Sequence, residues 1–142
     1  MLRLILSVLL SATAMNATHA QDVTTPATGT AERKQLLDSV RSPLERKLNQ
    51  PIKFVVKSLK VSGDWAFLYA AMQGADGHPV NYIGTSFEGA SEAGVMSKDY
   101  AALLQRSGAT WSVRAEAIGP TDVAWTNWAH DYGAPAAIFD VD

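Results

Sequence analysis

The stretch IKFVVKSLKVSGDWAFLYAAMQ, Ile52 to Gln73, decides the fold, because it contains two strand patterns joined by a short turn. Ser62-Gly63-Asp64 separates the two runs, and a short connection containing glycine is typical of a β-hairpin. In the returning strand, Trp65 to Gln73, apolar side chains project to both sides. A strand without a polar face is predicted to be central in its sheet and covered on both faces.

The first strand of this hairpin, Ile52 to Ser62, does not alternate regularly. Its apolar residues fall into two sets of opposite parity: Ile52, Phe54 and Val56 against Leu59 and Val61. Because side chains in a strand alternate with a period of two residues, one extra residue is needed to bring both sets to one face. We therefore predict a β-bulge around Lys57 and Ser58 that bends the sheet.

A second hairpin is predicted further along the chain. Tyr100 to Gln105 and Thr110 to Ile118 are strand patterns, joined by a turn at Arg106-Ser107-Gly108-Ala109. In the second strand, alternation predicts one set of inward side chains: Trp111, Val113, Ala115 and Ala117. Between the hairpins, Gly74 to Asp99 holds five of the ten glycines and is predicted to be a binding loop or a mobile loop. We place a short strand at Val80 to Thr85 within it.

Helices are predicted before and after the strands. From about Thr30 to Asn49, apolar residues recur at helical spacing: Leu36, Leu37, Val40, Leu44 and Leu48. We expect a kink or restart at Ser42-Pro43, because proline removes a backbone donor. Near the C-terminus, GPTDVAWTNWAHDYGAP predicts a helix that begins at Thr121. Its apolar side holds Trp125, Trp128 and Tyr132, whereas His130 faces away, so this stretch is predicted to pack.

These elements predict an α+β domain with an N-terminal amphipathic helix, a curved antiparallel sheet of four or five strands, and a short C-terminal aromatic helix. The predicted division of the chain is a signal peptide at 1–20, a flexible leader at 21–30 and a single α+β domain at 31–142. Parallel βαβ units are not expected, because the only long helix precedes the strands.

The first twenty residues have the three parts of a secretory signal peptide. Arg3 supplies the positive charge, Leu4 to Leu10 the apolar run, and Thr18 and Ala20 the small residues that a signal peptidase recognises. The run of about seven residues is far shorter than the ~20 needed to cross a bilayer, so no transmembrane anchor is expected. We predict cleavage after Ala20, in preference to Ala14, and a periplasmic or secreted protein. The chain has no cysteine, which excludes a disulfide framework.

Charge is distributed unevenly along the chain. Between Arg33 and Lys60 there are eight basic residues and two acidic ones, whereas from Val61 onward there are ten acidic residues and three basic ones. The basic residues are Arg33, Lys34, Arg41, Arg46, Lys47, Lys53, Lys57 and Lys60. This pattern predicts two solvated surfaces of opposite sign, or alternatively a basic face for an anionic ligand or an envelope protein. Nucleic acid is not an expected partner, because no basic and aromatic motif is present.

Catalytic and metal-binding patterns are weak. Gly84 to Gly89 misses the G-x-S-x-G pattern by one residue, so Ser86 is not predicted to be a nucleophile. Only two histidines follow the signal peptide, and no ligand cluster surrounds them, so no metal site is expected. His130 and Asp131 are helix neighbours that point about 100° apart, which disfavours a catalytic dyad. The sequence contains no phosphate-binding loop and no nucleotide-binding motif, so no cofactor is expected.

His78 is the best candidate for a general base, because it lies beside Pro79 in the glycine-rich loop. Asp99 or Asp122 would be the carboxylate that orients it. The alternative is that His78 is simply an exposed loop residue. Seven aromatic residues are mostly predicted to be core, or else to line a cleft between the helices and the bent sheet: Trp65, Phe67, Tyr69, Trp111, Trp125, Trp128 and Tyr132.

Four segments of the chain resemble a group of small, exported, uncharacterised bacterial proteins: FVVKSLKVSGDWAFLYA, AALLQRSGATWSV, GPTDVAW and YGAPAAIF. The resemblance covers most of Arg33 to Phe139 and implies export, but it implies no activity and no functional residue. The order of elements is also similar to the cystatin-like and nuclear-transport-factor-2-like α+β folds, which serve enzymes, inhibitors and binding modules alike.

The sequence therefore favours a non-enzymatic envelope protein that binds a ligand or another protein. The alternative is a small periplasmic enzyme with an acid–base pair centred on His78. A binding module is preferred because no catalytic set converges, whereas a long glycine-rich loop lies beside an aromatic-rich sheet.

Overall fold

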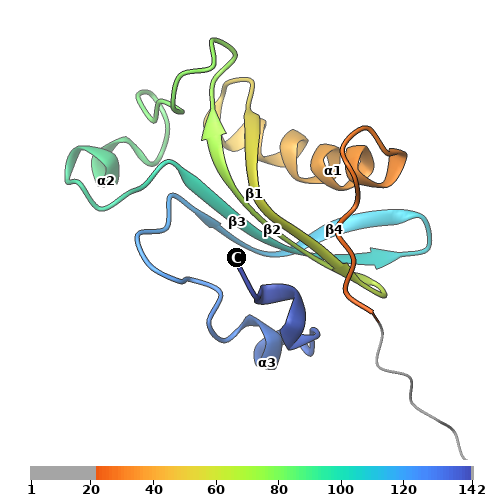
Figure 1. Ribbon diagram of the computed structural model, residues 1–142. Coiled ribbons are helices and arrows are strands. Elements are labelled where there is room, and N and C mark those ends of the chain that lie inside the picture. Colours follow the sequence, from red (N-terminus) through yellow and green to blue (C-terminus); the bar gives the residue numbers. More distant parts are fainter. Residues whose placement is uncertain (1–21, 142) are drawn as a thin grey trace, which may run out of the picture.

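A computed structural model of the protein describes residues 22–141 (Figure 1). The elements, in order, are α1 (Ala31–Leu48), β1 (Lys53–Ser62), β2 (Trp65–Gln73), α2 (Glu88–Glu92), β3 (Asp99–Ser107), β4 (Thr110–Ile118), α3 (Trp128–Tyr132) and the 3-10 helix η1 (Ala136–Phe139). In the described residues, β1-β2-β3-β4 form one antiparallel sheet in that order. The predicted α+β class is confirmed, with one helix before the sheet and a short helix after it.

The first hairpin has the predicted irregularity. Val56 lies opposite Ala70 but Ser58 lies opposite Tyr69, so Lys57 is the extra residue of a β-bulge in β1. The bulge returns Leu59 to the same buried cluster as the apolar residues before it. β2 occupies the predicted residues and is paired on both sides, with a separate buried cluster on each of its faces.

β4 departs from the predicted alternation. Leu103 lies opposite Ala115 whereas Leu104 lies opposite Val113, so Arg114 forms a second bulge. Trp111 and Val113 therefore pack in one cluster, and Ala115 and Ala117 pack in the other. The prediction that all four share one face is wrong for the two alanines. A small side chain fits either face, so the pattern did not indicate where the parity changes.

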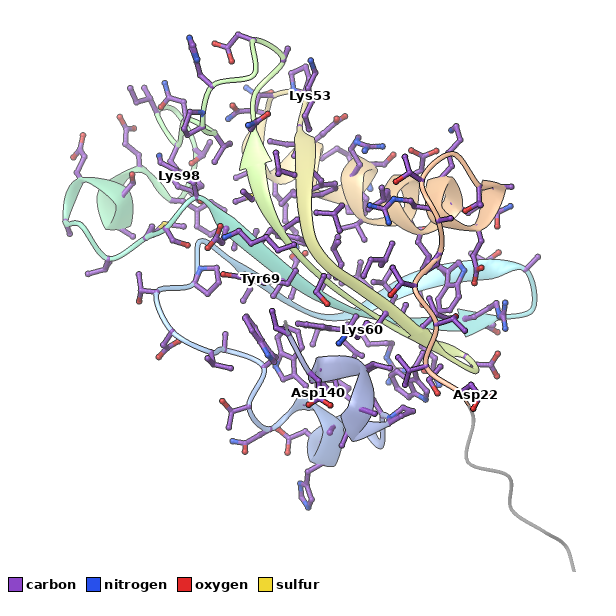
Figure 2. All side chains as sticks on the ribbon, in the orientation of Figure 1. Asp22, Lys53, Lys60, Tyr69, Lys98 and Asp140 are labelled. Carbon is purple, nitrogen blue, oxygen red and sulfur yellow. The ribbon has the colours of Figure 1, made fainter. Side chains whose placement is uncertain are left out.

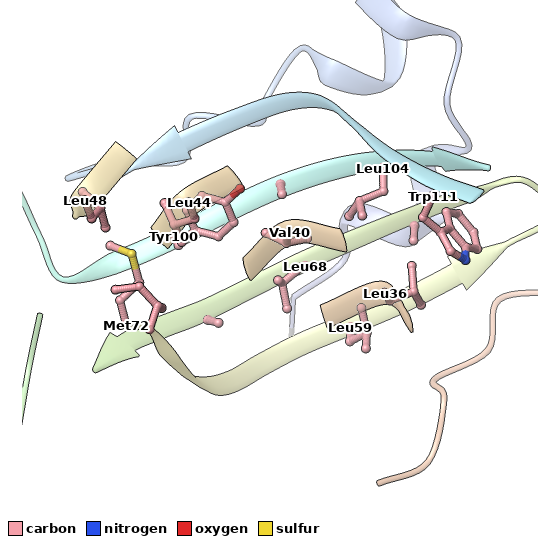
Figure 3. Close-up of a cluster of buried hydrophobic side chains, with 14 of the residues drawn as sticks. Leu36, Val40, Leu44, Leu48, Leu59, Leu68, Met72, Tyr100, Leu104 and Trp111 are labelled. Atoms are coloured by element: carbon pink, nitrogen blue, oxygen red, sulfur yellow. The ribbon is translucent and has the colours of Figure 1, made fainter. Parts of the chain in front are cut away.

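Helix α1 covers one face of the sheet, which we call the α1 face (Figure 3). Four side chains one turn apart are buried against β1 to β4: Leu36, Val40, Leu44 and Leu48. Thr30 caps the first turn by accepting a hydrogen bond from the Arg33 amide, and Asn49 ends the helix in a left-handed conformation. The helix continues through Pro43, so the predicted restart does not form. Val40 before the proline and Leu44 after it are both buried against the sheet, so the helix is packed on both sides of Pro43.

The segment after β4 covers the opposite face, which we call the C-terminal face (Figure 1). The core here is built on Phe67, which is fully buried and whose ring centroid lies 5.3 Å from that of Trp125. The predicted helix from Thr121 is wrong in extent, because residues 121–127 form turns and α3 begins at Trp128. His130 is exposed, as predicted, whereas Tyr132 is also exposed.

The connection between β2 and β3 contains no strand at Val80 to Thr85, contrary to the prediction. One isolated bridge, between Gln73 and Pro79, is followed by turns and by the short helix α2. Tyr82 is buried and anchors this connection to the body of the domain. Two buried side chains, Val80 and Tyr82, and the Val80 amide, which donates to the Met72 carbonyl at 3.1 Å, hold the segment without a continuous strand pairing.

The leader differs from the flexible segment that the sequence predicts. Thr24 exchanges two backbone hydrogen bonds with Val61, each 2.8 Å long, and Pro26 is buried. The Arg33 guanidinium donates to the Pro26 carbonyl at 3.0 Å. The described part of the leader therefore lies along the outer edge of β1. The predicted signal peptide, 1–20, lies outside the described residues, and among the described helices none is long and apolar enough to span a membrane.

Candidate functional site

A groove of about 620 Å³ lies on the C-terminal face, between the sheet and the segment that follows β4. Figure 2 shows Tyr69 on the side of the sheet that faces this segment. The groove is lined by Tyr69, Met96, Ser97, Asp99, Pro120, Thr121, Asp122, Val123, Trp125 and Val141. It combines aromatic and apolar walls with two carboxylates, which is the composition of a small-ligand site.

Backbone hydrogen bonds around Gly119 fix the shape of the groove. The Gly119 amide donates to the Asp99 carbonyl at 2.8 Å, and the Ser97 amide donates to the Gly119 carbonyl at 3.0 Å. The Ser97 hydroxyl donates to the Pro120 carbonyl. Tyr82 donates its hydroxyl to the Ser97 carbonyl at 2.7 Å, and burial, aided by the nearby Asp99 carboxylate, raises the pKa of Tyr82 to about 12. The wall of the groove is thus tied to both β3 and β4.

A polar cluster of Lys57, Tyr69 and Asp99 forms one end of the groove. The Lys57 ammonium lies 2.7 Å from one Asp99 carboxylate oxygen, and the Tyr69 hydroxyl donates to the other at 2.9 Å. The same ammonium lies 4.7 Å from the centroid of the Tyr69 ring. The hydrogen bond to Asp99 raises the pKa of Lys57 above its usual value. Lys57 is the extra residue of the bulge and precedes Ser58, which lies opposite Tyr69.

The Tyr69 ring continues into the aromatic core of the C-terminal face. Its centroid lies 4.9 Å from that of Trp125, which in turn packs on Phe67. Tyr69 is therefore held by an aromatic neighbour on one side and by the Asp99 carboxylate on the other. A side chain fixed in this way presents its ring to a ligand at little further cost in conformational entropy.

Asp122 lies on the rim of the groove, in the turns that replace the predicted helix start. The residue is exposed, and its carbonyl accepts a hydrogen bond from the Ala124 amide at 3.0 Å. Within the part of the chain that the structure describes, no side chain pairs with the Asp122 carboxylate. This carboxylate is free to meet a ligand.

In the structure, His78 does not lie beside either of the carboxylates that were predicted to orient it. Asp99 and Asp122 line one groove, whereas His78 is exposed in the connection after β2 and its amide donates to Asp76 at 3.0 Å. Among residues 22–141 the His78 ring has no hydrogen-bond partner. The groove therefore contains both candidate acids, Asp99 and Asp122, but not the candidate base, His78.

His130 and Asp131 are closer than the helical spacing predicts. Nδ1 of His130 lies 3.2 Å from a carboxylate oxygen of Asp131. The His130 side chain is 95% exposed, so the pair has no cavity in which to act on a substrate.

Ser86 lies in a separate hollow of about 490 Å³ near the end of α1, together with Lys47, Phe87, Glu116 and Ile118. Glu116 forms an ion pair with Lys47 and accepts a hydrogen bond from the buried Tyr100 hydroxyl at 2.7 Å. Burial and the Glu116 carboxylate raise the pKa of Tyr100. No histidine lines this hollow. Lys47 and Tyr100 both bind Glu116, which is typical of a structural network.

The predicted basic face is divided between two surfaces. Arg33, Lys34 and Arg41 extend from α1, whereas Lys57 and Lys60 reach over the C-terminal face. Each of these five contacts an acidic side chain or a backbone carbonyl. The described residues also contain no group of three potential metal ligands.

Comparisons of the chain with protein-family models, with curated proteins and with solved structures find no match. The function is therefore argued from the groove. Two of its acidic residues, Asp99 and Asp122, were named from the sequence in another role, but Lys57 and Tyr69 were not. The bulge predicted around Lys57 and Ser58 was the local signal near them, and the structure adds that Ser58 is the partner of Tyr69.

Proposed function

We propose that the protein is an exported, non-enzymatic module of the cell envelope that binds a small ligand or a side chain of another envelope protein in the groove. The observation that carries this proposal is a groove of about 620 Å³ with aromatic walls and an unpaired carboxylate on its rim. Backbone hydrogen bonds preform its walls, and preformed concave sites are typical of ligand-binding proteins.

The alternative, a small periplasmic enzyme that uses His78, has less support from this geometry. General acid–base catalysis needs a base within hydrogen-bond reach of the substrate. His78 does not line the groove, and the acids that do, Asp99 and Asp122, have no histidine beside them. A groove with acids and aromatic walls favours binding over proton transfer.

Photo-crosslinking tests the proposed binding site. We expect a photoreactive phenylalanine analogue in place of Val123, on the groove wall, to form one discrete adduct in intact cells. Ile83 is the matched control, because it is 72% exposed, more than the 57% of Val123, and lies outside the groove. An adduct of equal yield from both positions would reflect exposure alone and would contradict the proposal.

Export is tested by the mass of the protein recovered from the envelope fraction. We expect a mature chain that begins at Gln21, because Thr18 and Ala20 present small side chains to a signal peptidase. Intact-protein mass spectrometry distinguishes this chain from one cleaved after Ala14. Recovery of the chain in the cytoplasm with Met1 retained would contradict the prediction.

A further inference from the structure

The groove differs in charge from the hollows along α1. Each of three hollows on that helix is lined by at least one basic side chain: Arg33, Lys47 and Arg46 respectively. The groove on the C-terminal face is lined by Asp99 and Asp122, and no Lys, Arg or His is among its lining residues. Lys57 pairs with Asp99 from outside this lining, so Asp122 supplies the unpaired negative charge, and a cation is favoured over an anion at the groove.

The groove already holds one ammonium group, that of Lys57. This group approaches Asp99 at 2.7 Å and lies 4.7 Å from the centroid of the Tyr69 ring. A carboxylate and an aromatic face together are the arrangement by which proteins recognise an alkylammonium group. The geometry of Tyr69 and Asp99 therefore fits this chemical group, whether it is attached to the chain or to a ligand.

The Lys57 ammonium is poorly protected in this position. Its side chain is 40% exposed, and Lys57 is the extra residue of the bulge rather than a residue in register. Exposed ion pairs contribute little to stability, since water and a flexible lysine chain offset the attraction. A ligand can therefore displace Lys57 from Asp99 at a small cost.

We infer that the groove binds an alkylammonium group, which displaces Lys57 from Asp99 and the Tyr69 face and is attracted to the rim by Asp122. This inference rests on the proposed function, since it assigns the ligand chemistry of the same groove. The apolar chain of the ligand lies against Val123 and Pro120, which line the same groove as the two carboxylates. An alkylammonium group occurs both in small amines and in the lysine side chains of proteins.

Titration of the isotope-labelled protein with n-butylammonium, followed by amide NMR, tests the inference. We expect shifts at the amides of residues 97–99 and 121–123, and no such shifts with n-butyrate. Lys57→Met should tighten binding about two- to fivefold, because it leaves Asp99 and Tyr69 vacant. Asp122→Asn should weaken binding at least about twofold, because an exposed carboxylate attracts a cation weakly.

The peptide acetyl-Ala-Lys-Ala-amide is a second probe, which tests the source of the alkylammonium group. If the peptide causes the same shifts, a lysine side chain of a protein is a ligand source. If only butylammonium causes them, the ligand is a small amine.

Asp64→Asn is the matched control for Asp122→Asn, since it removes one exposed carboxylate, 67% accessible, that lies outside the groove. An equal loss of affinity in Asp64→Asn and Asp122→Asn would show attraction to net charge alone and would overturn the inference. Tighter binding of butyrate than of butylammonium would overturn it too. If butylammonium fails to bind but Val123 still forms its discrete adduct, the ligand chemistry is wrong and the binding site stands. If both fail, the proposed function fails as well.

Discussion

Replacing Phe67 by alanine is expected to lower the free energy of unfolding by about 3–5 kcal/mol. Phe67 is fully buried at the centre of the C-terminal face, where its ring centroid lies 4.9 Å from that of Phe139 and 6.4 Å from that of Trp128. Alanine would leave a cavity bounded by large rings held by turns and short helices. Rings of this size cannot move into the cavity without breaking other contacts, so little of the loss would be recovered.

Urea denaturation followed by circular dichroism measures this effect. His130→Ala is the control, because its side chain is 95% exposed and a surface substitution is expected to change stability by no more than about 0.5 kcal/mol. A loss below about 1 kcal/mol at Phe67 would mean that the segment after β4 does not pack on the sheet, since typical core truncations cost more. The groove would then lack its outer wall, and the proposed binding site would fall with it.

The sheet could be predicted from the sequence because its signals are local. The alternation of β1 fails at a single point, and only one extra residue, at Lys57 or Ser58, restores it. β2 is apolar on both sides, which indicates a central strand before any partner is known. The bulge in β4 escaped prediction because Ala115 and Ala117 are small enough to pack on either face.

The segment after β4 could not be predicted because distant contacts decide its structure. Helical spacing places Trp125 and Trp128 on one side, but Trp125 packs on Phe67 and Tyr69, which lie in β2. Turns over 121–127 bring the ring there, and the helix begins only afterwards. The pairing of the leader with Val61 could not be predicted either, because a polar, threonine-rich segment is joined to β1 there by backbone atoms alone. Local propensity does not report such contacts.

The candidate site was predicted in part. Asp99 or Asp122 was predicted to orient His78; both acids line the groove, but His78 does not. Lys57 contacts Asp99 across 42 residues and Tyr69 contacts it across 30, so no motif spacing indicates the cluster. The sequence places Lys57 among the residues of a basic face, whereas in the structure its side chain extends to Asp99 at the groove.

Gly119→Ala is expected to destabilise the protein by about 2–5 kcal/mol, through two separate effects. Gly119 has a φ of +64°, a left-handed conformation that costs a non-glycine residue roughly 1–2 kcal/mol. An added Cβ would also lie 2.9 Å from the Ser97 carbonyl oxygen and 2.6 Å from the Met96 methyl group. The methionine can rotate away. The carbonyl belongs to a backbone fixed by the Ser97 amide, which donates to Gly119 itself, so relief of this contact breaks the pairing.

Gly133→Ala separates the two effects. Gly133 has nearly the same φ, +68°, but nothing lies within 4 Å of an added Cβ, so only the conformational cost of about 1–2 kcal/mol is expected. Urea denaturation of both variants measures the difference, which reports the contacts of the added Cβ with the Ser97 carbonyl, the Met96 methyl group and the Tyr82 hydroxyl. Equal losses would mean that the Ser97 backbone yields freely. Such a backbone could not hold the wall of the groove, because Ser97 and Asp99 are positioned through Gly119. A larger loss for Gly119→Ala, accompanied by weaker butylammonium binding in the folded fraction, would show that the same hydrogen bonds support both stability and the site.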